Sequence, residues 1–283
     1  MPALRLLTAS YADDPALDTA VSRALMLRVA AGELPETLRI SRPGAIVAFG
    51  KRDVVSGGYP AAVGAARDGG FEAIERLAGG RAAVFHEDTI AFAHAVRDPD
   101  PRARVHERFE ATAGRVARAL RGLGVDARVG EVAGEYCPGS HSVSSRGERK
   151  LMGVGQRLVA GGAHVGGVVV VDGAERVRDV LVGVYDALDL AWRPETTGSV
   201  AEESRGAPWQ AVSDAIVAEY GERYDLEPAE LDGETLALAR RLALDHLSPR
   251  AQAAHEPHEE PRARADEQGE GHRSEADRAG TRG

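Results

Sequence analysis

The chain has 283 residues, of which 43% are hydrophobic, 5% are aromatic and 28% are charged. This length is enough to bury a large core in one large domain or two small ones. The net charge of −9, from 44 acidic and 35 basic residues, argues against a general nucleic-acid binder. No segment approaches the roughly 18 apolar residues of a membrane-spanning helix. We therefore expect neither nucleic acid nor a membrane among the partners.

The cysteine content and the N-terminal segment indicate the cellular compartment. A single cysteine excludes an internal disulfide and is typical of a reducing compartment. The apolar run over residues 1–7 is too short for a signal peptide, and Asp13 and Asp14 follow it closely. We expect a cytoplasmic protein.

The first third of the chain combines strands with two helices. Residues 16–31 carry apolar side chains three to four positions apart, which is typical of an amphipathic helix. A short helix over 60–68 begins at its proline. Strands separated by glycine- or proline-containing turns are expected at 37–41, 45–49, 71–76, 82–86 and 89–96. The last two should pair with each other across the Glu-Asp turn at 87–88.

The remainder of the chain has longer elements. Residues 102–123 place their apolar side chains on one face and form the clearest helix. Strands at 150–159 and 162–171 should form a hairpin around the glycines between them. Further helices are expected at 174–187, 208–222 and 232–247. Runs of two or three strands interrupted by helices, without strict βαβ alternation, indicate the α+β class.

The composition changes at about residue 250. From there on the chain is rich in His, Glu, Arg, Gly and Pro and shows no apolar periodicity. A segment with little apolar surface to bury does not offset the entropy of ordering it. We therefore predict a catalytic domain over residues 1–249 and a disordered charged tail over residues 250–283.

Cys137 has the most informative surroundings. It lies in a Glu-Tyr-Cys-Pro-Gly segment at 135–139, ahead of a basic, glycine-containing run at 149–157. A thiolate attacks acyl carbonyls. An ammonium such as that of Lys150 would stabilise the oxyanion and help keep the thiol ionised. The alternative is an inert cysteine, because free cysteines are among the most buried residues.

Three groups of motifs follow one another along the chain. The first comprises segments 38–44 and 47–52, the second is segment 76–86 with its paired glycines, and the third comprises segments 137–139 and 147–157. In this order they resemble the lipoate–protein ligase family, most closely its cysteine-dependent octanoyl/lipoyl amidotransferase branch. The resemblance implies the biotin/lipoate protein ligase catalytic fold, a mixed β-sheet packed against helices.

The same resemblance implies an acyltransferase of protein lipoylation. An octanoyl or lipoyl group would pass through a Cys137 thioester to the lysine of a lipoyl-domain protein, without any cofactor. Expected partners are lipoyl-domain proteins (H protein, E2 subunits) or acyl carrier protein. One alternative is an ATP-dependent lipoate–protein ligase, which would use ATP and Mg and leave Cys137 a bystander. Another is a non-catalytic relative that binds lipoyl domains or acyl groups.

The resemblance also assigns site residues. Cys137 and Lys150 are the expected catalytic residues, and Lys150 matches the family's lysine at the carbonyl of the bound acyl group. The expected substrate-binding residues are Arg76, Gly79, Gly80, His86, Gly153 and Gln156. The paired glycines would wall the acyl slot, since glycine lets a backbone approach a ligand closely, or they would form an ordinary turn. His86 would orient a loop or the substrate, or serve structure alone.

Histidines offer two other interpretations. His141 and His164 would join Cys137 in a metal site, but a second ligand pair is missing and we expect no metal. His141 would alternatively deprotonate Cys137, a role that we rank below that of Lys150.

The chain departs from the family pattern at several positions. Ala78 stands where the family has Ser or Thr, and Arg81 stands where it often has a third Gly. His-Ser-Val at 141–143 replaces the usual Tyr-Asp-Leu. The Asn-Asp pair that helps ligases hold nucleotide and metal is absent near this point.

Basic residues are frequent in the three motif groups. If the groups converge in space, they form a patch suited to an acidic partner; otherwise these are scattered solvated charges. The residues are Arg42, Lys51, Arg52, Arg76, Arg81, Arg149, Lys150 and Arg157.

Overall fold

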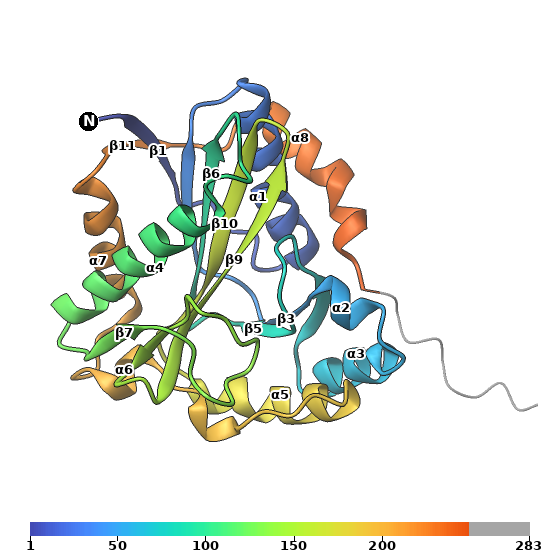
Figure 1. The fold of residues 1–283 in the computed structure, drawn as a ribbon. Coiled ribbons are helices and arrows are strands. Elements are labelled where there is room, and N and C mark those ends of the chain that lie inside the picture. The colour runs from blue at the N-terminus through green and yellow to red at the C-terminus, as the bar shows by residue number, and fades with distance from the viewer. Residues whose placement is uncertain (249–283) are drawn as a thin grey trace, which may run out of the picture. The chain divides into compact units, whose positions relative to one another are not determined.

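A computed structural model describes residues 1–248 and centres on an eight-stranded mixed sheet in the order β11-β1-β2-β6-β10-β9-β8-β7 (Figure 1). In this sheet β1 runs parallel to both of its neighbours, and the other neighbouring strands are antiparallel. The strands are β1 (Ala3–Leu7), β2 (Thr37–Ser41), β6 (Thr89–Arg97), β7 (Ala127–Val129), β8 (Val143–Ser145), β9 (Arg149–Val159), β10 (Gly162–Val170) and β11 (Asp225–Ala229). The predicted α+β class and the β9–β10 hairpin are confirmed.

A second sheet has three strands in the order β4-β3-β5. They are β3 (Ile46–Phe49), β4 (Glu72–Glu75) and β5 (Ala83–Phe85). The predicted pairing of 82–86 with 89–96 is therefore wrong, because β5 pairs with β3 while β6 pairs with β2 and β10. The turn that ends with a hydrogen bond from Thr89 N–H to the His86 carbonyl carries the chain from one sheet to the other.

All six predicted helices are present. The structure adds short helices at α2 and α6 and 3₁₀ turns at Pro194–Thr196 and Ala243–His246. In α1 the Asp14 carboxylate accepts from the Leu17 N–H at 3.1 Å, and left-handed Gly32 ends the helix. The helices are α1 (Pro15–Ala31), α2 (Lys51–Val54), α3 (Tyr59–Asp68), α4 (Val105–Gly122), α5 (Ala174–Ala187), α6 (Val200–Glu203), α7 (Trp209–Gly221) and α8 (Gly233–Leu242).

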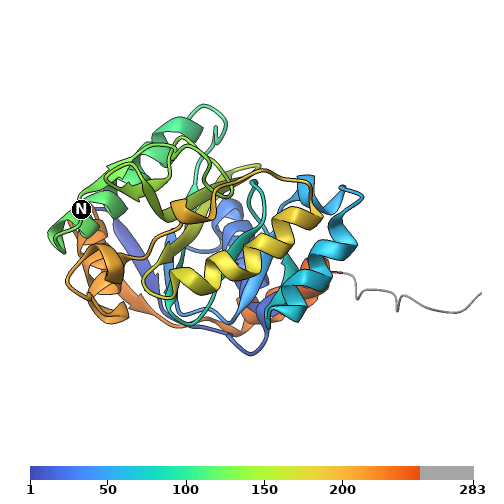
Figure 2. The same ribbon diagram turned by 90° about the horizontal axis from the view of Figure 1, so that it is seen from below.

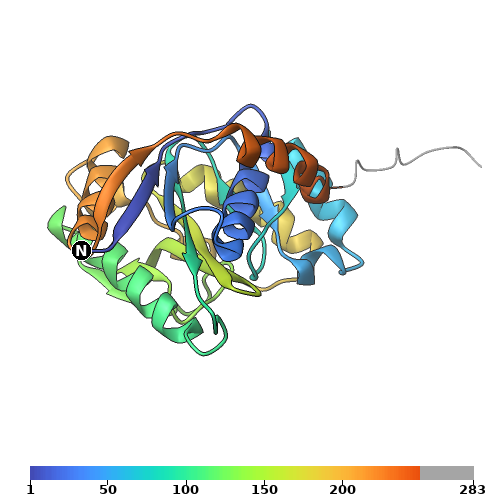
Figure 3. The ribbon, with the colours of Figure 1, turned by 90° about the horizontal axis from the view of Figure 1, so that it is seen from above.

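Helices cover both faces of the large sheet. On one face α4 packs beside α7, and on the other α1 packs beside α8 (Figure 3). The small sheet is covered by α3 and α5, which lie side by side (Figure 2). Among residues 1–248 no helix is long and apolar enough to cross a bilayer. The predicted tail over 250–283 lies outside the described residues.

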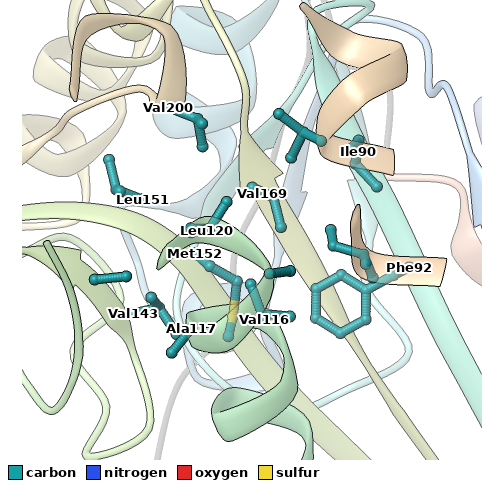
Figure 4. Close-up of a cluster of buried hydrophobic side chains, with 14 of the residues drawn as sticks. Ile90, Phe92, Val116, Ala117, Leu120, Val143, Leu151, Met152, Val169 and Val200 are labelled. Carbon is teal, nitrogen blue, oxygen red and sulfur yellow. The ribbon is translucent and has the colours of Figure 1, made fainter. Parts of the chain in front are cut away.

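The core beneath α4 holds the strands that carry the site. Side chains of α4 point toward those of β6, β8, β9 and β10, and the labelled residues are buried (Figure 4). Leu151 and Met152 of β9 are fully buried there. Burying a side chain of this size contributes about 1.5–3 kcal/mol, so the strand that bears Lys150 is firmly anchored.

Candidate active site

A cavity of about 400 Å³ lies between α4, the two sheets and the loop that contains Cys137. Most of the expected site residues line it. They are Cys137, Lys150, Arg76, Gly79, Gly80, Gly153 and Gln156. The second and third motif groups thus converge on one space, whereas no residue of the first group lines it.

The Cys137 thiol lies beside two hydrogen-bond donors. Its Sγ accepts the backbone N–H of Arg81 at 3.2 Å and lies 3.7 Å from Nη1 of Arg76. Burial raises the pKa of the Cys137 thiol, but the charges of Arg76 and Lys150 and the Arg81 N–H together bring that pKa below its usual value. The thiolate is therefore more populated than in a free cysteine, as a nucleophile requires.

The backbone at Cys137 is in an unusual conformation. Its φ of 43° lies in the left-handed region, which side-chain-bearing residues rarely occupy. The N–H of Cys137 donates to Oη of Tyr185 at 2.7 Å, and that hydroxyl donates to the Ala82 carbonyl at 3.0 Å. Such strain persists only where the surroundings hold it, and it is common at active sites.

Gly80 is the closest glycine to the thiol. Its φ is 121°, and a Cβ placed there would lie 2.9 Å from the Sγ of Cys137 and 2.9 Å from Nη1 of Arg76. The position therefore requires glycine both for its backbone and for the thiol's space. This explains the second glycine of the pair in the loop after β4.

Lys150 reaches the cysteine loop from β9. Its Nζ donates to the carbonyls of Tyr136 and Cys137, each at 2.9 Å, and lies 4.7 Å from the centre of the Tyr136 ring. Gly153 leaves room for this side chain, because a Cβ there would lie 3.3 Å from the lysine Cε. The ammonium is buried beside the nucleophile, where it can act on developing charge.

Gln156 lines the cavity but has both ends of its amide occupied. Its Nε2 donates to the Val105 carbonyl at 2.8 Å, and its Oε1 accepts from Nε of Arg108 at 2.9 Å. These bonds fix the start of α4 to β9. Gln156 thus shapes the wall formed by Phe109, whose ring stacks on His141 with centroids 5.0 Å apart.

His86 does not line the cavity. Its ring is buried against Gly173, its Nδ1 accepts from the Asp88 N–H at 3.2 Å, and burial together with the nearby Arg176 charge lowers its pKa. The structure therefore places His86 as a neutral residue that supports the turn between the two sheets.

The histidines of the alternative metal set are not brought together. His141 lines the main cavity with Cys137, whereas His164 lines a separate hollow of about 90 Å³. Among residues 1–248 no group of three or more His, Cys, Asp or Glu side chains is gathered as a metal site needs.

Only part of the predicted basic patch forms. Lys51, Arg76 and Arg157 line a hollow of about 180 Å³ together with Glu75 and with Arg23, which pairs with Asp245. Arg149 instead pairs with two glutamates of the α6 segment. The other members also lie elsewhere: Arg81 pairs with Asp53, Arg42 stacks on Trp209, Lys150 is buried, and Arg52 is exposed on α2 outside the hollow.

Sequence reasoning missed Glu135 and Tyr185. Glu135 is fully buried and lies 3.5 Å from Nζ of Lys150. Burial raises the pKa of Tyr185 well above its usual value, so its hydroxyl stays protonated and donates. Glu135 was visible as a charge next to Cys137, but nothing in the sequence locates the distant Tyr185.

The comparison with protein families identifies this class of protein. The model of the lipoyl protein ligase A/B catalytic domain matches residues 14–220, and the chain belongs to this family. Two solved structures share the fold. Ta0514 of T. acidophilum, with bound lipoic acid, has a TM-score of 0.69 at 20% identity and covers 87% of this chain and 96% of its own. A lipoate-protein ligase A bound with ATP has a TM-score of 0.68 at 19% identity and covers 86% and 94%.

Curated relatives share part of the sequence. The octanoyl-[GcvH]:protein N-octanoyltransferase of Geobacillus kaustophilus is 28% identical over 163 residues, which are 58% of this chain and 57% of the relative. The enzyme of the same name from Bacillus velezensis is 29% identical over 198 residues, 65% of this chain and 68% of the relative. The match to the first relative therefore spans little more than half of that relative's length.

Proposed function

We propose that this protein is an acyltransferase of protein lipoylation that carries an octanoyl or lipoyl group on Cys137. The observation that carries the proposal is the Cys137 thiol with a lowered pKa, which receives the Arg81 N–H and faces a cavity beside the buried ammonium of Lys150. A ligase that activates its acyl group with ATP has no need of such a nucleophile.

The first half-reaction loads the enzyme. The Cys137 thiolate attacks the acyl carbonyl of the donor, a C–S bond forms, and the carbonyl oxygen becomes an oxyanion beside Lys150. The bond to the donor then breaks. A leaving lysine amine takes up one proton, whereas a leaving thiolate needs none.

The second half-reaction transfers the group. The acceptor lysine amine attacks the thioester, a C–N bond forms and the C–S bond breaks. The amine loses one proton and the Cys137 thiolate is regenerated. Because the acyl group arrives already activated or already as an amide, this route needs neither nucleotide nor metal, while the alternative ligase would need ATP and Mg.

Room for the acyl chain exists next to the thiol. The hollow of about 90 Å³ shares Arg76, Phe85 and Gly167 with the main cavity, so the two adjoin. Its walls include the apolar side chains of Ile46 and Ile74. An apolar slot that continues from the nucleophile suits a saturated chain.

The partners are proposed from the relatives and from charge. The names of the relatives state octanoyl transfer from GcvH to a protein, which supports lipoyl-domain proteins, H protein and E2 subunits, as donor or acceptor. Acyl carrier protein is the other donor to be tested. The basic hollow at Lys51 and Arg157 would face an acidic partner. A thiol that must stay reduced also supports a cytoplasmic location.

The test is mass spectrometry of the intact protein after incubation without ATP. One sample receives octanoyl-acyl carrier protein and another receives an octanoylated lipoyl-domain protein, each beside a Cys137→Ser control. We expect an octanoyl adduct that hydroxylamine releases and that the Cys137→Ser protein lacks.

Two other results would replace the proposal. Labelling of an acceptor domain that requires ATP and octanoate or lipoate, and that survives Cys137→Ser, would make the protein a ligase. Binding of acyl groups or lipoyl domains without any transfer would make it a non-catalytic relative.

A further inference from the structure

Glu135 is a buried carboxylate that touches both Lys150 and the cysteine loop. We propose that Glu135 is the positioning residue of this site, which balances the charge of Lys150 and fixes the loop that presents Cys137. This role rests on the proposed function, because it concerns the same thioester chemistry. Nothing in the sequence motifs assigns it.

The charge of Lys150 is balanced in a dry environment. The Lys150 side chain is 1% exposed, that of Glu135 is 0% exposed, and Nζ lies 3.5 Å from Oε2. A buried ammonium without a counter-ion is strongly unfavourable. Among residues 1–248 Glu135 is the carboxylate paired with this ammonium.

The distance of 3.5 Å between Nζ of Lys150 and Oε2 of Glu135 leaves one N–H of the lysine available as a donor. An ammonium has three N–H donors, and the carbonyls of Tyr136 and Cys137 take two of them. Oε2 of Glu135 has no hydrogen-bond partner among the described residues. Glu135 therefore supplies negative charge without occupying the third N–H, which remains available for an oxyanion at the acyl carbonyl.

The other carboxylate oxygen closes the cysteine loop. Oε1 of Glu135 accepts the Gly139 N–H at 2.9 Å and the Ser142 hydroxyl at 2.7 Å. These two bonds join the beginning of the loop at 135 to its end at 142. Lys150 binds the middle of the loop by donating to the Cys137 carbonyl. Through its contacts with the loop and with Lys150, Glu135 consequently sets the distance between the Lys150 ammonium and the Cys137 thiol.

Glu135→Gln separates these two roles. The amide oxygen can still accept from Gly139 and Ser142, so the bonds within the loop are kept. The amide NH₂ would face the lysine donors, and the substitution removes the negative charge. The matched control is Glu131→Gln, because Glu131 is an exposed carboxylate four residues earlier on the same approach to the loop. Acyl-enzyme formation and the pH dependence of Cys137 alkylation are measured for each protein.

We expect Glu135→Gln to slow acyl-enzyme formation about 10- to 100-fold, the scale for misplacing a catalytic group by up to an ångström, with KM within about three-fold. The alkylation profile should move to higher pH. The charges that favour the Cys137 thiolate are those of Arg76 and Lys150. Loss of the Glu135 charge by itself would favour the thiolate, so a shift to higher pH reports a displaced Lys150. Glu131→Gln should match the parent protein within two-fold.

A double variant keeps the test decisive if Glu135→Gln folds poorly. Glu135→Gln with Lys150→Met removes both charges and should fold, since deleting a whole buried pair is tolerated better than breaking it. If Glu135 acts through Lys150, the double variant is no slower than Lys150→Met alone, and its alkylation profile is the same.

The proposal is overturned if Glu135→Gln keeps the parent rate and alkylation profile within two-fold. It is also overturned if the double variant loses a further factor of ten relative to Lys150→Met. Should the parent protein form no acyl-enzyme at all, the proposed function fails. The alkylation profiles would then still test the placement of Lys150 by Glu135.

Discussion

Two buried ion pairs flank the cavity and are built differently. Behind the wall, Nη1 of Arg108 donates to Asp98 at 2.6 Å and its Nε donates to Gln156. Beside the thiol, Lys150 lies 3.5 Å from Glu135, and one oxygen of that carboxylate has no hydrogen bond among the described residues. The Arg108–Asp98 pair, called the tight pair below, has its hydrogen bonds satisfied. The Lys150–Glu135 pair, called the loose pair, leaves one N–H donor of Lys150 available.

This difference separates a structural charge pair from a reactive one. Full satisfaction of a buried network makes a region rigid, as at the start of α4. An incompletely satisfied pair costs stability, and that cost is typical of sites where strain serves chemistry. The positive φ of Cys137 lies at the loose pair. The following substitutions test whether the two regions behave as this contrast predicts.

The largest contrast is between Lys150→Met and Arg108→Met. Loss of Lys150 leaves Glu135 buried without its partner and so also lowers stability, but in addition it should slow acyl-enzyme formation about 10²- to 10³-fold, as for the loss of an oxyanion donor. Loss of Arg108 leaves the buried Asp98 with a longer ion pair to Arg104 at 3.9 Å, which should lower the free energy of unfolding by at most about 3–5 kcal/mol and change the rate only a few-fold. Urea unfolding and single-turnover acylation measure the two. Equal losses of acylation rate in the two variants would contradict the distinction between a structural and a reactive ion pair.

Gly80→Ala tests the space around the thiol. The new Cβ would lie 2.9 Å from Sγ of Cys137 and adopt a φ of 121°. We expect acylation to fall about 10²-fold, which is the scale for misplacing a reacting group by an ångström, with a stability loss of about 1–3 kcal/mol. Gly57→Ala is the control, because Gly57 lies outside the cavity and a Cβ there meets no atom within 4 Å. A fully active Gly80→Ala protein would contradict the geometry.

The lowered pKa of Cys137 links stability to pH. The folded state binds the thiol proton less tightly than the unfolded chain, whose cysteine pKa is about 8.5. The contribution of this thiol to stability is therefore present above that value and is lost as pH falls through the folded pKa. Urea unfolding of the parent and Cys137→Ser proteins should show a difference that grows with pH across this window. A difference independent of pH would contradict the lowered pKa.

Tyr185→Phe probes the support of the strained backbone. The Cys137 N–H loses its acceptor and the Ala82 carbonyl loses its donor. We expect a stability loss of about 1–3 kcal/mol for these unsatisfied groups and a rate loss of about ten-fold or less from slight misplacement of the thiol. Thermal unfolding and acylation kinetics check both values. The corresponding loss at the rigid pair, Gln156→Leu, should affect stability but leave the alkylation profile unchanged.

The smallest effect is expected at the basic hollow. Lys51→Ala and Arg157→Ala should raise KM for an acidic protein substrate a few-fold at low salt, and the effect should vanish at high salt because exposed charges are screened. Arg128→Ala is the control, since Arg128 lies on β7 and pairs with Asp126. If the control shifts KM equally, the net field and not the hollow attracts the partner.

The sequence motifs predicted which residues lie around one cavity better than the strand pattern predicted the sheets. Helices with long apolar periodicity, such as α4, and the glycine-flanked β9–β10 hairpin carry local signals, and they are confirmed. Residues 82–86 and 89–96 also carry a strand signal. Their partners lie in two different sheets, and local pattern does not distinguish them.

Within the site, short-range motifs predicted which residues meet but not how. Cys137 and Lys150 were named because each lies in a recognisable segment. Glu135 was not, because the chain has 44 acidic residues and only burial reveals which one faces a buried lysine. Gln156 was expected to bind substrate, but its amide is hydrogen-bonded to the start of α4. The strand pattern of the sequence does not show this contact.

The parallel pairing of β1 with β11 has a consequence in time. Residues 3–7 pair with residues 225–229, which are synthesised more than 200 residues later. At about 5–20 residues per second, the ribosome needs on the order of ten to forty seconds to supply that partner. Until then one edge of β1 remains an open template for wrong pairing. The pairing of β1 is thus completed only after more than 200 further residues have been added.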